Sequence, residues 1–319
     1  MRCGEFLLVD GVEIKSPLTC GWSGPLKSAA AQPQVSRLRE LALERRFGQP
    51  PPLDASGYDR AAFIPEFYDH VVPYASRPDI GFYVETARQH GGPVLELGCG
   101  TGRILIPTAR AGININGLDA SEGMLRVCRA RLDTEPADVQ RRTELHHGDI
   151  RQFDLGHRFD LITLPFRPFQ YLLTVEEQLA CLNAIWHHLQ LNGRLVFDLF
   201  NPSVHHLAKP VDPAATDDEP PFTHPDRRIV TRRSRILERD LADQTFAGEL
   251  VYDVTHPGGR TERLVHHYRF RYLFRFEAEH LLARAGFSVD HVYSGFDHAP
   301  YGSHYPGELI FVARRRPAS

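Results

Sequence analysis

The segment with the clearest chemical potential is Val94-Leu95-Glu96-Leu97-Gly98-Cys99-Gly100-Thr101-Gly102. An apolar run that predicts a strand leads into three glycines at alternate positions, and Glu96 lies two residues before the first of them. We expect a tight turn without Cβ atoms at the start of a helix, where a ligand can lie against backbone N–H groups. The spacing G-x-G-x-G differs from the G-x-G-x-x-G of dinucleotide-dependent dehydrogenases, which argues against a nucleotide-binding oxidoreductase.

Alternating strands and helices surround this turn. Apolar runs predict the strands, and a helical period of apolar residues predicts the helices between them. Thr174 and Glu177 form a capping box at the start of the third helix, and Asn192-Gly193 predicts the turn after it. Strands separated by helices indicate a parallel sheet with right-handed crossovers. The expected strands are 93–98, 113–118, 143–147, 159–164 and 194–199, and the expected helices are 103–111, 121–131 and 175–189.

Two acidic residues follow later strands of this pattern. Asp119 ends the second strand, and Asp149 lies in the turn Gly148-Asp149-Ile150 after the third. With the glycine turn and Glu96, this order resembles the class I S-adenosylmethionine (SAM) methyltransferases over roughly residues 58–319. The resemblance implies an α/β fold with a Rossmann-like seven-stranded sheet that ends in an antiparallel hairpin. It also implies SAM as cofactor, S-adenosyl-L-homocysteine (SAH) as product, and methyl transfer by in-line displacement.

The resemblance assigns a role to several residues around the turn. Asp119 would accept both ribose hydroxyls, because a carboxylate offers two acceptor oxygens; the alternative is an acid at a helix N-terminus. Asp149 would accept from the adenine amino group, or is an ordinary loop acid. Arg77 would bind the methionine carboxylate, with Tyr68 and Tyr74 closing over the site; the alternative is a surface arginine and packing tyrosines. The implied cofactor set is Tyr68, Tyr74, Arg77, Glu96, Gly98, Cys99, Gly100, Gly102, Asp119, Ala120, Met124, Gly148, Asp149, Ile150 and Leu164.

The segment after the fourth strand, residues 164–171, lies beside the sulfonium in this fold. Arg167, Gln170 and Tyr171 are therefore the expected contacts that position the acceptor. The segment carries neither the N-P-P-Y of nucleic-acid amino methyltransferases nor the serine- and histidine-containing version of sugar N-methyltransferases. We expect a small-molecule acceptor that is methylated on nitrogen or oxygen, and we assign no general base. The alternatives are a non-catalytic SAM-binding regulatory protein and an RNA methyltransferase.

The predicted domains follow changes in composition. Residues 1–57 are expected to be a flexible N-terminal extension, residues 58–205 and 277–319 the SAM-binding domain, and residues 206–276 an antiparallel β insertion that covers the acceptor. Alternation over 262–276 predicts one aromatic face, which would pack on the methyltransferase domain or on a second subunit in a homodimer. Its members are Leu264, His266, Tyr268, Phe270, Tyr272, Phe274 and Phe276. A helix at 277–285 and strands at 288–295 and 308–314 would follow.

Composition narrows the class of protein. The net charge is −3, so the arginines at 227–235 and Arg269 are expected to be solvated or to meet an anionic small molecule rather than a nucleic acid. The 17 histidines include adjacent pairs, whose side chains diverge, so we expect no metal site. The five cysteines are scattered, no apolar run has the length of a membrane span, and no signal peptide is evident. We therefore expect a cytoplasmic protein.

Overall fold

The computed structural model describes residues 8–9, 12–13, 55–58 and 60–316. The chain divides into two units, Met1–Pro50 and Pro51–Ser319. In the first unit, β1 (Leu8–Val9) and β2 (Val12–Glu13) pair antiparallel. The rest of the predicted flexible extension, up to residue 54, lies outside the described residues. Residues 55–57, which were predicted to belong to that extension, are part of the second unit.

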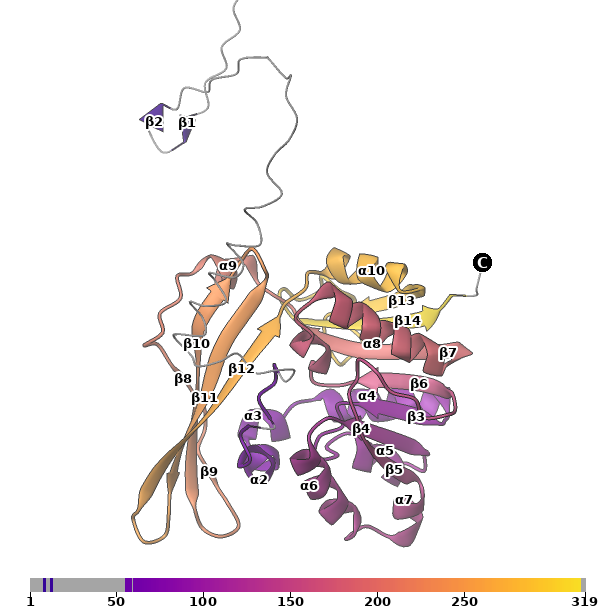
Figure 1. Cartoon of the computed structure of the whole chain (residues 1–319), viewed down its shortest axis with the longest axis horizontal. Helices are drawn as coiled ribbons and strands as arrows, with labels where there is room; N and C mark the ends of the chain where they lie inside the picture. Colours follow the sequence, from indigo (N-terminus) through magenta and orange to yellow (C-terminus); the bar gives the residue numbers. More distant parts are fainter. Residues whose placement is uncertain (1–7, 10–11, 14–54, 59, 317–319) are drawn as a thin grey trace, which may run out of the picture. The chain divides into compact units, whose positions relative to one another are not determined.

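A seven-stranded sheet forms the centre of the second unit (Figure 1). Its order is β13-β14-β7-β6-β3-β4-β5. The strands from β7 to β5 are parallel, and β14 runs antiparallel to both of its neighbours, which confirms the predicted sheet with a terminal hairpin. The strands are β3 (Val94–Leu97), β4 (Ile115–Asp119), β5 (Thr143–His147), β6 (Phe159–Leu164), β7 (Leu189–Phe200), β13 (Phe287–Tyr293) and β14 (Glu308–Arg315).

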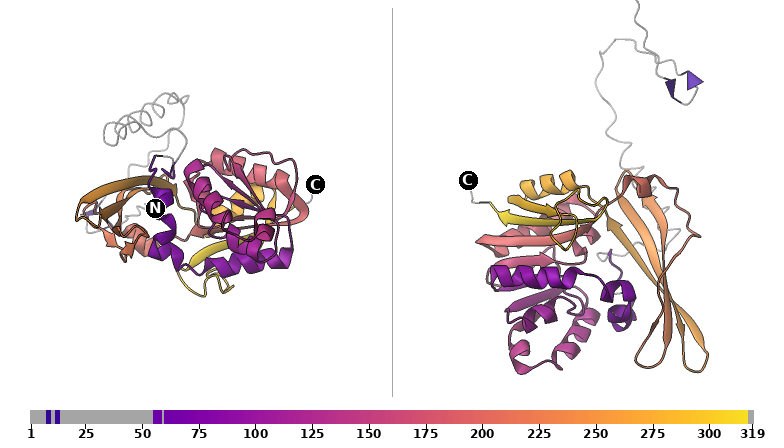
Figure 2. Two further views of the ribbon diagram at one scale, coloured as in Figure 1. Left: turned by 90° about the horizontal axis from the view of Figure 1, so that it is seen from below. Right: turned by 180° about the vertical axis from the view of Figure 1, so that it is seen from behind.

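Helices cover both faces of the sheet, as Figure 2 shows. Side chains alternate between faces along a strand. Leu95 and Leu97 accordingly pack toward α8 and α10, whereas Val94 packs toward α4, α5 and α6. The helices on the first face are α8 (Val175–His188) and α10 (Arg275–Arg284), and those on the second are α4 (Asp79–His90), α5 (Leu105–Arg110), α6 (Glu122–Leu132) and α7 (Ala137–Arg141). Ser121 caps α6, and Thr174 with Glu177 forms the predicted capping box of α8.

A second, antiparallel sheet lies between β7 and α10 in the sequence. Short segments before α4 pack between this sheet and α6, where Phe67 and Val71 join Met124, Val230 and Tyr252 in one apolar cluster. The sheet therefore faces the carboxyl ends of the parallel strands (Figure 1). The strands of this sheet are β8 (Asp217–Asp218), β9 (Phe222–Thr223), β10 (Ile229–Asp240), β11 (Thr245–Thr255) and β12 (Thr261–Arg271), and the short helix α9 (Val204–Ala208) precedes them. The segments that pack before α4 are α2 (Ile64–Phe67), η1 (Tyr68–His70) and α3 (Val72–Ala75).

Two predicted boundaries were wrong. The last insertion strand ends at Arg271 rather than at residue 276. The reason is that α10 already begins at Arg275, where Glu277 caps it by accepting the Phe274 N–H group. Phe274 and Phe276 are therefore not on the aromatic face of the strand, and Phe276 is exposed. In addition, β7 begins at Leu189 and runs through Asn192-Gly193, with a shift of register against β6 in place of the predicted turn.

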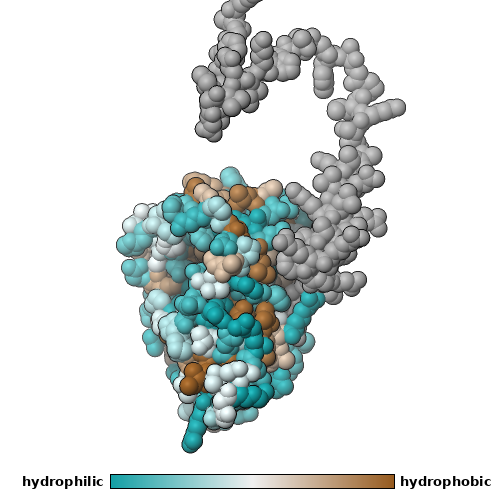
Figure 3. All heavy atoms as spheres, turned by 90° about the vertical axis from the view of Figure 1, so that its left-hand side faces the viewer, coloured by the Kyte–Doolittle hydropathy of each residue, from teal (hydrophilic) through white to brown (hydrophobic). Residues whose placement is uncertain are grey.

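Among the described residues, no helix has the length and apolar character to cross a membrane. Figure 3 shows the face of the molecule on the side of the insertion, where hydrophilic residues predominate and apolar ones are scattered. The exposed apolar side chains of the insertion strands are Ile229 and Val265. Single apolar residues are normal on a monomer surface, so the homodimer stays a prediction.

Gln170 in η2 (Pro168–Tyr171) joins the two sheets, and it offers a test of their packing. Its buried side chain donates from Nε2 to the Arg271 carbonyl (3.1 Å) and accepts the Phe200 N–H at Oε1 (2.6 Å). Gln170→Leu would leave two buried backbone groups without partners, so we expect the free energy of unfolding to fall by about 1–3 kcal/mol. Denaturant unfolding measures this change. Gln89→Leu, which changes an exposed glutamine of α4, is the control, and an equal effect of both variants would contradict the assignment.

Candidate functional site

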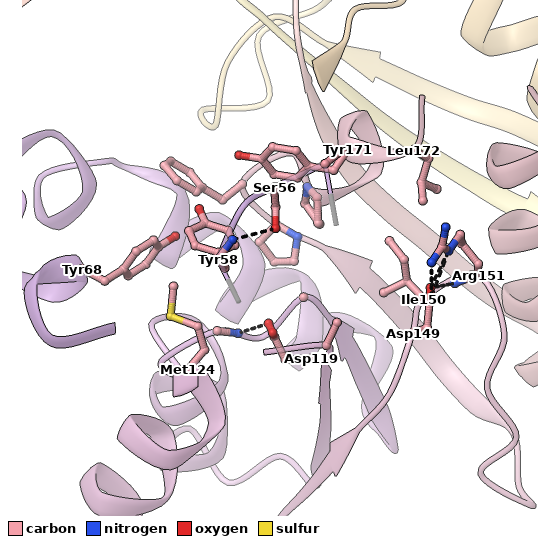
Figure 4. Close-up of a pocket in the computed structure, with 17 residues that line it drawn as sticks. Ser56, Tyr58, Tyr68, Asp119, Met124, Asp149, Ile150, Arg151, Tyr171 and Leu172 are labelled. Atoms are coloured by element: carbon pink, nitrogen blue, oxygen red, sulfur yellow. Dashed lines mark hydrogen bonds and ion pairs between the residues drawn. The ribbon is translucent and has the colours of Figure 1, made fainter. Parts of the chain in front are cut away.

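The carboxyl ends of the parallel strands border a cavity of about 320 Å³ (Figure 4). The turn after β3, the end of β4, the loops after β5 and β6, and residues 55–58 all contribute to its wall. Ligands of open α/β sheets bind at this edge, where the strand order reverses. The described lining residues are Ala55, Ser56, Tyr58, Tyr68, Gly98, Gly100, Asp119, Ala120, Met124, Asp149, Ile150, Arg151, Pro165, Phe166, Pro168, Tyr171 and Leu172.

The glycine turn has the conformation that its composition predicts. Gly98, Gly100 and Gly102 have φ values of 72°, 54° and 82°, which side chains rarely adopt. A Cβ atom on Gly98 would lie 2.9 Å from the Pro168 side chain, and one on Gly102 would lie 2.7 Å from Cys128 Sγ. At Gly100 a Cβ atom would meet no atom within 4 Å. The turn thus packs tightly on both sides and leaves open space at its middle glycine, which lines the cavity.

Asp119 fixes the turn to the next strand. Its Oδ2 accepts the Gly100 N–H (2.8 Å), and its Oδ1 accepts the Ser121 N–H (2.8 Å). Ser121 in turn accepts the Met124 N–H at the start of α6. The carboxylate therefore lies at the cavity wall with both oxygens held in place (Figure 4).

Asp149 is paired with its neighbour Arg151, which also lines the cavity. The Arg151 guanidinium donates to both Asp149 oxygens (2.5–3.0 Å) and to Glu177 of the α8 capping box (2.7 Å). Burial opposes ionisation of Asp149, but its hydrogen bonds to Arg151 hold the pKa of this carboxyl below its usual value. Asp149 is therefore an anion, and Arg151 connects it to α8.

Aromatic side chains form the side of the cavity opposite the glycine turn. Tyr58, Tyr68 and Tyr171 gather there, with Tyr58 6.3 Å from each of the other two rings (Figure 4). Burial raises the pKa of Tyr58 and of Tyr68 well above the usual value. These two hydroxyls stay protonated at neutral pH, so they act as hydrogen-bond donors and acceptors rather than as bases.

Comparison with known proteins now identifies the type of site. Residues 94–193 match the family described as "Methyltransferase domain". The cypemycin N-terminal methyltransferase of a Streptomyces species is 27% identical over 82% of this chain and 99% of its own length. A dTDP-3-amino-3,4,6-trideoxy-alpha-D-glucopyranose N,N-dimethyltransferase of Streptomyces venezuelae is 32% identical over 39% of this chain, which spans about half (49%) of that relative.

Solved structures show the same fold. The CcbJ methyltransferase of Streptomyces caelestis superimposes with a TM-score of 0.67 over 83% of this chain and all of its own, at 24% identity. SAM-bound CalS10 of Micromonospora echinaspora, an amino pentose methyltransferase, gives 0.54 over 87% of this chain and 96% of its own, also at 24% identity. This chain is a class I SAM-dependent methyltransferase.

The structure of this methyltransferase brings many of the predicted site residues to the cavity. Other predicted residues lie elsewhere: Cys99, for example, packs against Gly117 and does not line the cavity. The predicted residues that line the cavity are Tyr68, Gly98, Gly100, Asp119, Ala120, Met124, Asp149, Ile150 and Tyr171. Those that do not are Tyr74, Arg77, Glu96, Cys99, Gly102, Gly148, Leu164, Arg167 and Gln170.

Three of the predicted residues that do not line the cavity have polar partners elsewhere in the protein. Arg77 donates to Asp79 (3.0 Å), Asp198 (2.8 Å) and Glu308 (3.2 Å), and its contact with the methionine carboxylate stays a prediction. Arg167 also pairs with Glu308 (3.1 Å). Gln170 bonds to backbone groups of β7 and β12, as described above. Each of these polar side chains is used inside the protein, and sequence position alone does not reveal such partners.

Sequence reasoning missed part of the cavity wall. Tyr58 was predicted to begin the methyltransferase domain and was given no role in the site. Ala55 and Ser56 were predicted to lie in the extension, yet the Ala55 carbonyl accepts the Arg269 N–H (2.8 Å) and the Ser56 carbonyl lies 2.6 Å from His266 Nε2. Arg151 follows the predicted residue Ile150, and Phe166 precedes the predicted residue Arg167. These neighbours in the sequence were the signal that could have identified both as lining residues. The full missed set is Ala55, Ser56, Tyr58, Arg151, Pro165, Phe166, Pro168 and Leu172.

Glu96 lies on the α4 and α5 side of β3, where it is 2% exposed and its Oε2 atom has no hydrogen-bond partner within the described part of the chain. Burial raises the pKa of this carboxyl well above 4.5, although Arg103 opposes the shift. An acid whose pKa is higher in the folded than in the unfolded state contributes most to stability at low pH, where both states are protonated. This contribution is lost as the pH rises toward the pKa of the folded state, because the unfolded state ionises first. The side chain therefore behaves as a neutral acid inside the sheet.

We predict that Glu96→Gln, which resembles the protonated acid, becomes more favourable relative to wild type as pH rises from 5 to 8. The measurement is the free energy of unfolding of both proteins across this range. Glu122→Gln is the control, because Arg129 holds the pKa of the exposed Glu122 below its usual value and this side chain is ionised throughout the range. A difference between Glu96→Gln and wild type that stays constant from pH 5 to 8 would show that Glu96 is ionised in the folded state.

Proposed function

We propose that this enzyme transfers the SAM methyl group to the nitrogen of an amine on a small molecule. The observation that carries the proposal is the chemistry of the cavity wall opposite the glycine turn. That wall consists of tyrosine rings with protonated hydroxyls, next to Phe166. A neutral amine needs orientation and exclusion of water but no base, whereas a hydroxyl acceptor needs a base within hydrogen-bond reach.

The ionisable groups near the cavity are used for other contacts. Asp119 accepts two backbone N–H groups, and Asp149 accepts from Arg151. His266 does not line the cavity: its ring packs on Tyr58 (5.2 Å between ring centroids), and its Nε2 atom donates to the Ser56 carbonyl (2.6 Å). An amine acceptor fits this environment better than a hydroxyl acceptor. The names of the relatives support the same conclusion, because one is a cypemycin N-terminal methyltransferase and another is an amino-sugar N,N-dimethyltransferase.

The proposed reaction uses the two sides of the cavity differently. SAM supplies an electrophilic methyl group. The glycine turn and Asp119 would hold the cofactor, with the Asp119 carboxylate as acceptor for the ribose hydroxyls and the open space at Gly100 beside it. The tyrosine side would orient the acceptor amine toward the cofactor and exclude water, which in-line methyl transfer requires. The product ammonium releases one proton to water, and the aromatic faces stabilise its positive charge.

The arginines of the insertion support a small molecule over RNA. Arg232 pairs with Glu219 through two hydrogen bonds (2.7 Å each). Arg235 pairs with Glu249, and Arg233 with Asp253. Because carboxylates neutralise these three side chains, they offer none of the unpaired positive charge that phosphate recognition uses.

A matched acceptor panel tests the proposal. We expect the full-length protein with SAM to add one or two methyl groups to a nucleotide-linked amino sugar or to a peptide with a free N-terminal amine. The hydroxyl counterpart of each acceptor should remain unmodified. Mass spectrometry of the acceptor and quantification of SAH provide the readout. Methylation of a hydroxyl compound in preference to its amine counterpart would overturn the proposal.

Asp119→Ala tests the cofactor assignment separately. Loss of a charged acceptor for the ribose should weaken SAH binding by about 2–3 kcal/mol, or roughly 30- to 140-fold. Isothermal titration calorimetry measures the affinity. Glu122→Ala, which removes an exposed carboxylate from the first turn of α6, should bind SAH like the wild type. If Asp119→Ala also retained wild-type affinity, the ribose assignment would be incorrect.

A further inference from the structure

Asp198 lies near the carboxyl end of β7, and its fully buried carboxylate reaches the cavity wall through one hydrogen bond. Its Oδ1 accepts the Phe166 N–H (2.8 Å) and the Tyr83 O–H (2.7 Å), and its Oδ2 accepts from Arg77 (2.8 Å). Phe166 is a lining residue of the cavity, whereas Asp198 is not. Asp198 is thus one bond away from the acceptor side of the site.

Buried and half-buried ions surround this carboxylate. Arg77 bridges Asp79, Asp198 and Glu308, and Arg103 donates two hydrogen bonds of 2.6 Å to Asp79. Arg167 pairs with Glu308. Three guanidinium groups therefore meet three carboxylates, which balances their charge inside the protein. These residues come from five parts of the chain, and the network ties the loop after β6 to α4, β7 and β14.

The loop after β6 has a backbone that needs such an anchor. Phe166 and Arg167 have φ values of 66° and 69°, and two consecutive left-handed residues that are not glycine are strained. The Phe166 ring lies 5.1 Å from the Arg77 guanidinium and 5.2 Å from that of Arg103. It also contacts Tyr74 edge to face (4.8 Å). The same network therefore holds both the N–H group and the ring of Phe166.

We propose that Asp198 is a positioning residue for methyl transfer. By holding the strained Phe166 turn against the glycine turn, it fixes the wall that orients the acceptor amine; this role rests on the proposed N-methyltransferase function. Pro168, two residues after Phe166, contacts Gly98 of the glycine turn. A displacement of the Phe166 turn would therefore change the distance between the acceptor and the methyl group. Loss of the Asp198 bond should thus lower kcat more than it weakens cofactor binding.

The test compares Asp198→Ala, Asp198→Asn and Tyr83→Phe in the full-length enzyme. Asp198→Asn keeps an oxygen that can accept the Phe166 N–H but loses the charge, and Tyr83→Phe removes a different hydrogen bond to the same carboxylate. The three readouts are hydrogen exchange in a peptide that covers residues 164–170, SAH affinity, and kcat and KM with the amine acceptor.

We expect Asp198→Ala to accelerate exchange in this peptide and to lower kcat at least tenfold, with SAH affinity within about threefold of wild type. Asp198→Asn should give intermediate values, and Tyr83→Phe should leave exchange and kcat within about threefold. Equal losses in Tyr83→Phe and Asp198→Ala, or unchanged exchange and kcat in Asp198→Ala, would overturn the proposal. If the alanine variant does not fold, Asp198→Asn decides: losses no larger than those of Tyr83→Phe, or unchanged exchange and kcat, would then overturn the proposal. Hydrogen exchange and SAH affinity need no acceptor, so failure of this inference is distinct from failure of the proposed function.

Discussion

The close packing of the glycine turn is the constraint on which the rest of the site depends. Gly98 leaves no room for a Cβ atom beside Pro168, and Gly102 leaves none beside Cys128. The turn is therefore fixed to the loop after β6 on one side and to α6 on the other. Because Asp119 accepts the Gly100 N–H, the end of β4 is fixed to the same turn. The cofactor side and the acceptor side of the cavity thus share one rigid connection at the end of β3.

Charge balance in the interior follows from this packing. Elements that converge at the sheet edge bring polar residues into a region from which water is excluded, where an isolated charge is costly. The network around Asp198 pairs its charges, although burial still raises the pKa of the Asp198 carboxyl above its usual value. Burial raises the pKa of Glu96 as well. Burial also raises the pKa of Tyr58 and of Tyr68, whose hydroxyls are protonated at neutral pH in any case. Burial and pairing together determine which groups at the site carry charge.

Sequence patterns predicted what depends on local order in the chain. The apolar runs located the parallel strands, and the glycine turn with Asp119 and Asp149 located the cavity, because the carboxyl ends of parallel strands meet at one edge. The alternation through Phe276 was misleading, since aromatic residues continue past the strand into a helix that Glu277 caps. The helix-capping interaction of Glu277 overrode the alternation.

Hydrogen bonds and ion pairs between distant parts of the chain could not be predicted from the sequence. Arg77 was predicted to contact the cofactor; in the structure it also donates to Asp198 and Glu308, which lie 121 and 231 residues away in the sequence and were not predicted as partners. Ala55 and Ser56 carry no strong pattern, and one backbone and one side-chain hydrogen bond to β12 place them at the cavity. Contacts of this kind depend on the assembled sheets and leave no periodic signal in the chain.

The position of the insertion has a consequence for the way this protein diverges from its relatives. The matched family segment, residues 94–193, ends within β7 and contains the glycine turn, Asp119 and Asp149. The insertion leaves the fold after β7, and Phe200 at the end of β7 pairs with Glu308 at the start of β14. The insertion can thus change in sequence and length without disturbing this pairing. Similarity over the matched segment alone therefore reports on the part of the chain that holds the glycine turn and both acids, and it carries no information about the insertion.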